Sequence, residues 1–188
     1  MLAALISNGP SARMFPGRLL FDVVIAANWT VEWLDPDDVD WWAFSDWQTF
    51  AVKAQSRGEP GLYTKKRTAS HVRKQAPAPK REQWDRADKA GRIIYSEDIK
   101  RPPTWGHNTA TRVWSKWTGG LALGLAYHLG ATEIVVYGAD MQGRKDHQGR
   151  EGPSRTPERW VRERRQWAAL VSSLAEQGVN ATRVVQWP

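Results

Sequence analysis

The sequence predicts an α/β fold in which a mostly parallel open sheet is flanked by helices. Short β-branched runs alternate with helical stretches along the chain, which is typical of strands joined by crossover helices. The apolar runs end at polar or glycine-containing turns. With 41% hydrophobic and 25% charged residues, the 188-residue chain has the composition of a globular protein, and we expect residues 1–188 to form one domain.

The first half of the chain contains four predicted strands. They cover Leu2–Ile6, Asp22–Ala27, Asp40–Ser45 and Arg92–Tyr95, each a short apolar run bounded by turn residues. Between the third and fourth lies a segment, residues 53–90, with several glycines and prolines and no sustained hydrophobic period. We therefore expect residues 53–90 to form a basic, loop-rich insertion or lid within the domain.

The second half alternates helix and strand. The predicted elements are a helix over Thr118–Leu129 that ends before Gly130, a strand at Glu133–Tyr137, a helix from Pro157 to Gln177 and a strand at Ala181–Gln186. Helices between parallel strands make the arrangement Rossmann-like.

The positive charge is concentrated in the expected insertion. The chain carries a net charge of +7, and residues 53–81 contain nine basic residues against one acidic residue. Such a segment is suited to a polyanion such as nucleic acid, or is a solvated basic loop that aids solubility. The candidate nucleic-acid-binding residues are Lys65, Lys66, Arg67, Arg73 and Lys74.

Twelve tryptophans are an unusually large number for 188 residues. Some belong to the core, as Trp167 does on a helical face with Leu170 and Leu174. Others, such as Trp105 and Trp117, lie in polar surroundings, where an indole ring stacks on sugars or bases.

Polar residues follow four of the apolar runs directly. These are Asn8, Asn28, Asp46 and Asp140. Because ligands of open α/β sheets bind at the carboxyl ends of the strands, we expect these four residues to share one site.

Two glycine-containing motifs are candidates for phosphate binding. In Asn8-Gly9-Pro10-Ser11, glycine lets backbone N–H groups approach an anion, and the Ser11 hydroxyl is a helix cap or a phosphate ligand. Thr118-Gly119-Gly120 offers the same groups at a helix N-terminus, or is a simple cap with glycines for close packing. Neither motif is a Walker loop or a Gly-x-Gly-x-x-Gly fingerprint, which disfavours ATPases and ordinary NAD-dependent enzymes.

These motifs, with Asn28 and the run LALGLAYHLGATEIVVYGAD, resemble the bacterial sialyltransferases of glycosyltransferase family 42 and the archaeal hydroxymethylpterin diphosphokinase-like proteins. The resemblance covers residues 1–28 and roughly 30 residues from Thr118, and residues 53–117 match neither family. It implies a nucleotide-binding role for the matching residues Asn8, Gly9, Ser11, Asn28, Thr118, Gly119 and Gly120.

The resemblance also implies a catalytic histidine after the Gly-x-Asp segment. Here the histidine beyond that segment is His147, seven residues after Asp140, a shorter spacing than the family has. His147 is therefore one candidate base and equally a solvated loop residue. Asp46 and Asp140 are rival bases, because a carboxylate at a strand end can accept a hydroxyl proton.

The expected function is a glycosyltransferase that uses a nucleotide-sugar as co-substrate, with no permanently bound cofactor. A hydroxymethylated base in phage-type modified DNA is the candidate acceptor. The alternatives are a pyrophosphokinase acting on a small molecule and a non-catalytic nucleic-acid-binding module. Asp35-Pro36-Asp37 matches the Asp-x-Asp that holds a divalent metal in many transferases, but it is also an ordinary turn, and we assign no metal ligand.

Composition limits the remaining possibilities. The absence of cysteine excludes a disulfide scaffold and a thiol nucleophile. No apolar run approaches the roughly 18 residues of a membrane span. We expect a cytoplasmic protein, in the host cytoplasm if a phage encodes it. The sequence leaves open the donor base, the sugar and the oligomeric state.

Overall fold

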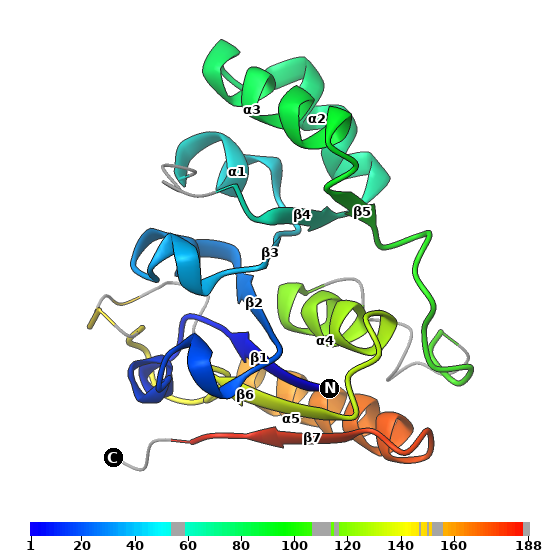
Figure 1. The fold of residues 1–188 in the computed structure, drawn as a ribbon. Helices are drawn as coiled ribbons and strands as arrows, with labels where there is room; N and C mark the ends of the chain where they lie inside the picture. Colours follow the sequence, from blue (N-terminus) through cyan, green and yellow to red (C-terminus); the bar gives the residue numbers. More distant parts are fainter. Residues whose placement is uncertain are drawn as a thin grey trace.

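Seven parallel strands of the described residues form one open sheet in the order β5-β4-β3-β2-β1-β6-β7 (Figure 1). The computed structural model describes residues 1–53, 59–106, 114, 117–146, 148–149, 151 and 156–185. The strands are β1 (Leu2–Ile6), β2 (Val23–Ala27), β3 (Trp41–Ala43), β4 (Gly61–Thr64), β5 (Ile93–Tyr95), β6 (Glu133–Tyr137) and β7 (Asn180–Arg183). The predicted α/β fold with a parallel sheet is confirmed.

The strand order reverses at β1. This strand pairs with β2 on one side and with β6 on the other. All five residues of β2 are buried, as expected for a parallel strand whose two faces are both covered. Ligands of such sheets bind beyond the carboxyl ends of the strands at the point of reversal. The topology alone therefore directs attention to the loops that follow β1 and β6.

Helices cover both faces of the sheet (Figure 1). Side chains of α4 (Thr118–His128) and α5 (Pro157–Ala175) pack on one face, and those of α1 (Trp47–Lys53), α2 (Lys66–Gln75) and α3 (Ala78–Lys89) on the other. Short 3-10 helices lie in the loops of the described residues: η1 (Pro10–Met14), η2 (Arg18–Leu20), η3 (Asn28–Glu32) and η4 (Pro36–Asp38). Within the described residues, none of the helices has the length and apolar character to cross a membrane.

The central helix α4 is buried almost all round, with eight of its eleven residues inaccessible. It lies between the sheet and the segment that contains Trp114. A Cβ on Gly120 would lie 2.2 Å from the carbonyl oxygen of Trp114. Gly120 therefore allows this close approach. Close packing was one of the two roles predicted for this glycine.

The prediction that residues 53–90 form a loop-rich segment is wrong. The described part of that segment folds as β4, α2 and α3, so it extends the sheet and covers it. Its helices bury few apolar side chains, and the buried residues of α3 consist of Trp84 alone, which packs edge-on against Phe50. Pro79 stands in the first turn of α3, where a proline is tolerated. A weak hydrophobic pattern and these prolines made a folded segment resemble a loop.

Candidate functional site

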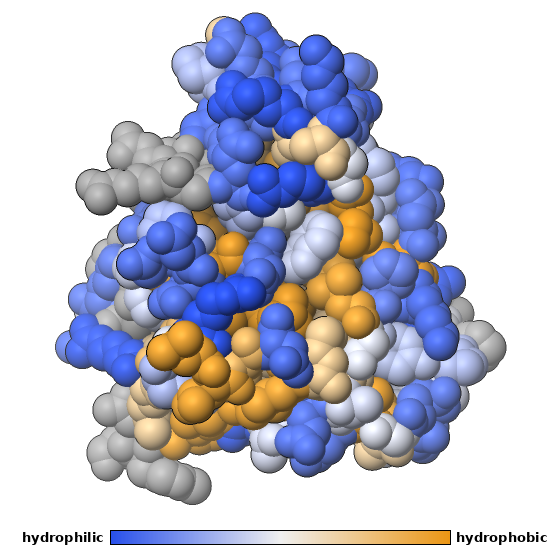
Figure 2. All heavy atoms as spheres, in the orientation of Figure 1, coloured by the Kyte–Doolittle hydropathy of each residue, from blue (hydrophilic) through white to orange (hydrophobic). Residues whose placement is uncertain are grey.

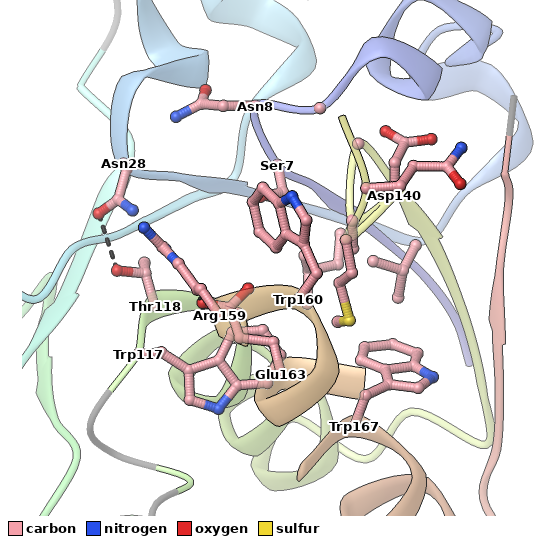
Figure 3. Close-up of a pocket in the computed structure, with 18 of the residues that line it drawn as sticks. Ser7, Asn8, Asn28, Trp117, Thr118, Asp140, Arg159, Trp160, Glu163 and Trp167 are labelled. Carbon is pink, nitrogen blue, oxygen red and sulfur yellow. Dashed lines mark hydrogen bonds and ion pairs between the residues drawn. The ribbon is translucent and has the colours of Figure 1, made fainter. Parts of the chain in front are cut away.

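A pocket of about 290 Å³ lies where the strand order reverses (Figure 3). Its walls are the residues that follow β1, β2, β3 and β6, together with the first residues of α4 and the first three turns of α5. The sequence prediction that polar residues at several strand ends share one site is consistent with this geometry.

Seven predicted site residues line the pocket: Asn8, Gly9, Asn28, Asp46, Thr118, Gly119 and Asp140. Of the predicted catalytic and nucleotide-binding residues that the structure describes, Ser11 and Gly120 are not part of its lining. His147 lies outside the described residues. Figure 3 shows Asn28 and Thr118 on one side of the pocket and Asp140 on the other.

The Asn28 side chain is held in one orientation by its neighbours. Its backbone is left-handed, with φ of 55°, a conformation that asparagine tolerates better than most residues. The Thr118 hydroxyl donates to Asn28 Oδ1 at 2.8 Å, so it accepts from the Ser45 hydroxyl 3.0 Å away. No hydrogen bond within the described part of the chain uses Asn28 Nδ2. The amide nitrogen therefore remains available to donate to a ligand.

Asn8 follows β1, the strand next to β2, and Figure 3 shows it above Asn28. Its Oδ1 is buried and accepts no hydrogen bond from the residues that the structure describes. A buried acceptor without a partner costs about 1–3 kcal/mol, so a ligand or a water that donates to it is favoured. Asn28 thus offers a donor to a polar ligand, and Asn8 offers an acceptor once its side chain turns the buried oxygen toward the pocket.

Ser11 is a structural residue, so its predicted role as a phosphate ligand is wrong. It is fully buried, and its Oγ accepts from the Gly138 N–H at 2.8 Å and donates to the Val184 carbonyl at 3.0 Å. Its own N–H donates to Asp140 Oδ2 at 3.0 Å, and the N–H of Gly9 donates to the Gly138 carbonyl. These two N–H groups tie the loop after β1 to the loop after β6, so they are not available to a phosphate.

Substituting Ser11 by alanine is expected to lower the free energy of unfolding by about 1–3 kcal/mol, because the buried Gly138 N–H loses its acceptor. Urea unfolding of the purified protein measures this change. Ser70→Ala on the exposed side of α2 is the control and should change stability by less than about 0.5 kcal/mol. Equal stability of the two variants would contradict the structural role of Ser11.

The described residues that line the pocket are acidic on balance. Its lining contains Asp46, Asp140 and Glu163 against Arg159, and Arg159 Nε is paired with Glu163 Oε1 at 2.7 Å. Asp140 is almost fully buried, whereas Asp46 is exposed. Such a pocket accepts hydroxyl groups from a ligand more readily than it accepts a phosphate.

Asp140 is held in place by the protein. Its Oδ2 receives the Ser11 N–H, and Arg183 lies close to it and donates to the Ala139 carbonyl at 3.0 Å. Burial lowers the pKa of Arg183 from its ordinary value, although the Asp140 carboxylate opposes that shift. This network makes Asp140 a weaker candidate for the base than the exposed Asp46.

Three tryptophans line the pocket: Trp117, Trp160 and Trp167 (Figure 3). The indole of Trp160 is fixed, since its Nε1 donates to the Gly143 carbonyl at 2.8 Å and the Arg159 guanidinium lies 5.4 Å from its ring. Trp167, which the sequence assigned to the core, packs against the core and also lines the pocket. Aromatic rings of this kind stack on bases and sugars.

The contribution of α5 was missed by the sequence analysis. Arg159, Trp160 and Glu163 stand in its first turns, directly after the loop that follows β6. The Pro157 that opens the helix was recognised, and a helix that starts there begins beside the predicted site. The position of Pro157 was therefore the sequence signal that could have placed the first turns of α5 at the site.

A second cavity, also of about 290 Å³, adjoins the pocket and shares Ser45 and Asp46 with it. Its other lining residues are Trp47, Gln48, Lys65, Arg67, Thr68 and His71. We call this the basic cavity, and the first pocket the switch pocket. Figure 2 shows the hydropathy of one face of the molecule, where hydrophilic side chains cover the helices α2 and α3 beyond the sheet.

The predicted nucleic-acid-binding residues do not form a continuous free surface. Lys65 and Arg67 line the basic cavity. Lys66 is paired with Asp98 at 2.7 Å and Arg73 with Asp88 at 2.9 Å, so acidic residues beyond position 81 offset their charge. Lys74 is exposed on α2, outside both cavities.

The Asp-x-Asp at residues 35–37 has a structural role. Asp35 caps η4, because its Oδ1 accepts from the Asp37 N–H at 3.1 Å. Across the described chain, no group of three or more histidine, aspartate or glutamate side chains is placed to hold a metal ion.

Comparisons of this chain with protein-family models, with curated proteins and with solved structures found no match. The resemblance to the family 42 sialyltransferases and to the hydroxymethylpterin diphosphokinase-like proteins therefore stays a prediction from the residues alone.

Proposed function

We propose that this chain is a nucleotide-dependent group transferase, specifically a glycosyltransferase that uses a nucleotide-sugar donor. The observation that carries the proposal is the convergence of Asn8, Asn28 and Trp160 on one pocket at the reversal of the strand order. Pockets at this place in parallel sheets are common nucleotide sites. The fold alone does not specify the reaction, which depends on the side chains that line the pocket.

The side chains suit a base and a sugar. A base or sugar ring can stack on Trp160 or Trp117, while Asn28 Nδ2 donates to it and Asn8 Oδ1 accepts from it. Carboxylates such as Glu163 are good acceptors for sugar hydroxyl groups. This combination of rings, amides and carboxylates supports a nucleotide-sugar more strongly than a simple anion.

Asp46 is the base of this proposal. Its carboxylate is exposed at the carboxyl end of β3 and borders both cavities, so it is accessible to an acceptor hydroxyl that meets the donor there. It would take the hydroxyl proton as the acceptor oxygen forms its bond to the sugar and the nucleotide phosphate leaves. For the acceptor, we retain the hydroxymethylated base of DNA, supported by Lys65 and Arg67 beside Asp46.

Calorimetric titration of UDP, CMP, GDP and ADP and their sugar conjugates, with and without Mg²⁺, tests the donor. One of these is expected to bind, and Asn28→Asp should weaken it by about 10- to 100-fold. This variant keeps the Oδ1 that accepts from Thr118 and tolerates the left-handed backbone, but it replaces the Nδ2 donor by a negatively charged oxygen.

The control for this experiment is Asn180→Asp, which makes the same chemical change at an exposed position at the start of β7. It should leave nucleotide affinity unchanged. The proposal fails if the wild-type protein binds none of the nucleotides, or if Asn28→Asp binds them as tightly as the wild type does.

A further inference from the structure

The two adjoining cavities differ in the sign of their charge. Among the described residues, the switch pocket is lined by three carboxylates and one guanidinium, whereas the basic cavity is lined by Lys65 and Arg67 against Asp46. A phosphate group in the switch pocket would be repelled by those carboxylates, and the same group in the basic cavity would be attracted. A ligand with a neutral ring at one end and a phosphate at the other therefore matches the pair.

The fold holds the basic cavity in place. Lys65 follows β4 directly, and Arg67 stands in the first turn of α2. Thr68 Oγ1 donates to the Ser45 carbonyl at 2.8 Å, which fixes that turn against the residue shared by the two cavities. His71 lies four residues after Arg67 and thus on the same face of the helix.

Arg67 differs from Lys66 and Arg73, two other basic residues of α2. Lys66 and Arg73 are both engaged in ion pairs, with Asp98 and Asp88. Arg67 is exposed at the cavity and forms no ion pair with another described residue. A guanidinium without a carboxylate partner is well suited to bidentate hydrogen bonds to a phosphate.

We propose that the basic cavity binds a phosphate group of the molecule whose polar ring occupies the switch pocket or reacts there. This inference rests on the proposed transferase function for the connection between the two cavities. The phosphate belongs either to the nucleotide donor or to a phosphate-bearing acceptor such as DNA, and the chemistry recognised by Lys65 and Arg67 is the same in both cases. Lys65 and Arg67 then also stabilise negative charge next to the reacting hydroxyl at Asp46.

Inorganic pyrophosphate is the first probe, because it tests the cavity without any nucleotide. Calorimetry should show that Arg67→Gln binds pyrophosphate about tenfold more weakly than the wild type, since a charge-assisted hydrogen bond is lost. Arg67→Lys, which retains the charge, should lose less. The control is Lys89→Gln, which removes one exposed charge at the end of α3 next to the amino end of β5, and it should bind like the wild type.

Two further probes distinguish the sources of the phosphate. If the donor supplies it, Arg67→Gln weakens a nucleoside diphosphate about tenfold and leaves the matching nucleoside unchanged. If the acceptor supplies it, Arg67→Gln weakens a short single-stranded oligonucleotide and leaves the nucleoside diphosphate unchanged. In that case the affinity for the oligonucleotide also falls steeply as salt is raised.

The outcomes separate this inference from the proposed function. The phosphate site is overturned if Arg67→Gln binds pyrophosphate, the nucleoside diphosphate and the oligonucleotide as the wild type does, or if the wild type binds none of them. Nucleotide binding that depends on Asn28 but not on Arg67 would retain the transferase and remove the phosphate site. Pyrophosphate binding that depends on Arg67, with no nucleoside or nucleotide bound in the switch pocket, would retain the phosphate site and remove the transferase.

Discussion

Asp46→Asn is expected to lower the rate of sugar transfer about 10²- to 10⁴-fold, the range that a positioned general base contributes. The substitution keeps the size of the side chain and removes its ability to take the acceptor proton. Because Asp46 is exposed and the described hydrogen-bond contact of its carboxylate is a long one, 3.4 Å to Ser45 Oγ, the fold should not change. Donor affinity should stay within about threefold of the wild type.

The rate can be measured without knowledge of the acceptor, as slow hydrolysis of the donor identified by the titrations. Water then takes the place of the acceptor and gives its proton to Asp46. Asp85→Asn, which removes an exposed carboxylate from α3, is the control and should hydrolyse the donor at the wild-type rate. Asp140→Asn is the decisive comparison, because loss of activity there with an active Asp46→Asn would transfer the role of base to Asp140.

The parts of the fold that the sequence predicted are those in which local pattern and tertiary environment agree. β1 and β6 have the predicted bounds because each is a short apolar run buried between helices. α2 and α3 could not be predicted in this way, since their stability comes from a few contacts such as Trp84 with Phe50. This contact joins residues 34 positions apart, and the local hydrophobic periodicity of the sequence does not predict it.

The residues of the candidate site also differ in whether the sequence could predict them. Asn8, Asn28 and Asp46 could be predicted because the carboxyl ends of parallel strands meet at one edge, whatever the loops between them do. The role of Ser11 could not, because its hydroxyl bonds residues that lie 127 and 173 positions away. A serine after a glycine-proline turn is compatible with a phosphate ligand and with a buried bridge, and only the packed structure separates the two.

Gly138→Ala is expected to be among the most destabilising single substitutions in the chain, by about 3–5 kcal/mol. Gly138 has φ of +72°, and a Cβ there would lie 2.1 Å from the Ser7 carbonyl oxygen and 2.6 Å from its carbon. Both are backbone atoms at the end of β1, so no side-chain rotation can relieve the overlap. The loops after β1 and β6 would have to separate.

Gly130→Ala is the control that separates the steric overlap at Gly138 from the backbone strain of a positive φ. Gly130 also has a positive φ, of +90°, but a Cβ at this position would have no atom of the described residues within 4 Å, so alanine there meets only the backbone strain of about 1–2 kcal/mol. Urea unfolding of the two variants should therefore differ by at least about 2 kcal/mol. Because Gly138 also lines the switch pocket, its variant should lose nucleotide affinity in conditions where it is still folded, whereas Gly130→Ala should retain it. Equal destabilisation of the two variants would contradict this prediction, because it would mean that the loops after β1 and β6 can separate freely. The hydrogen bonds between these loops would then not fix Asn8 and Asp140 in the pocket.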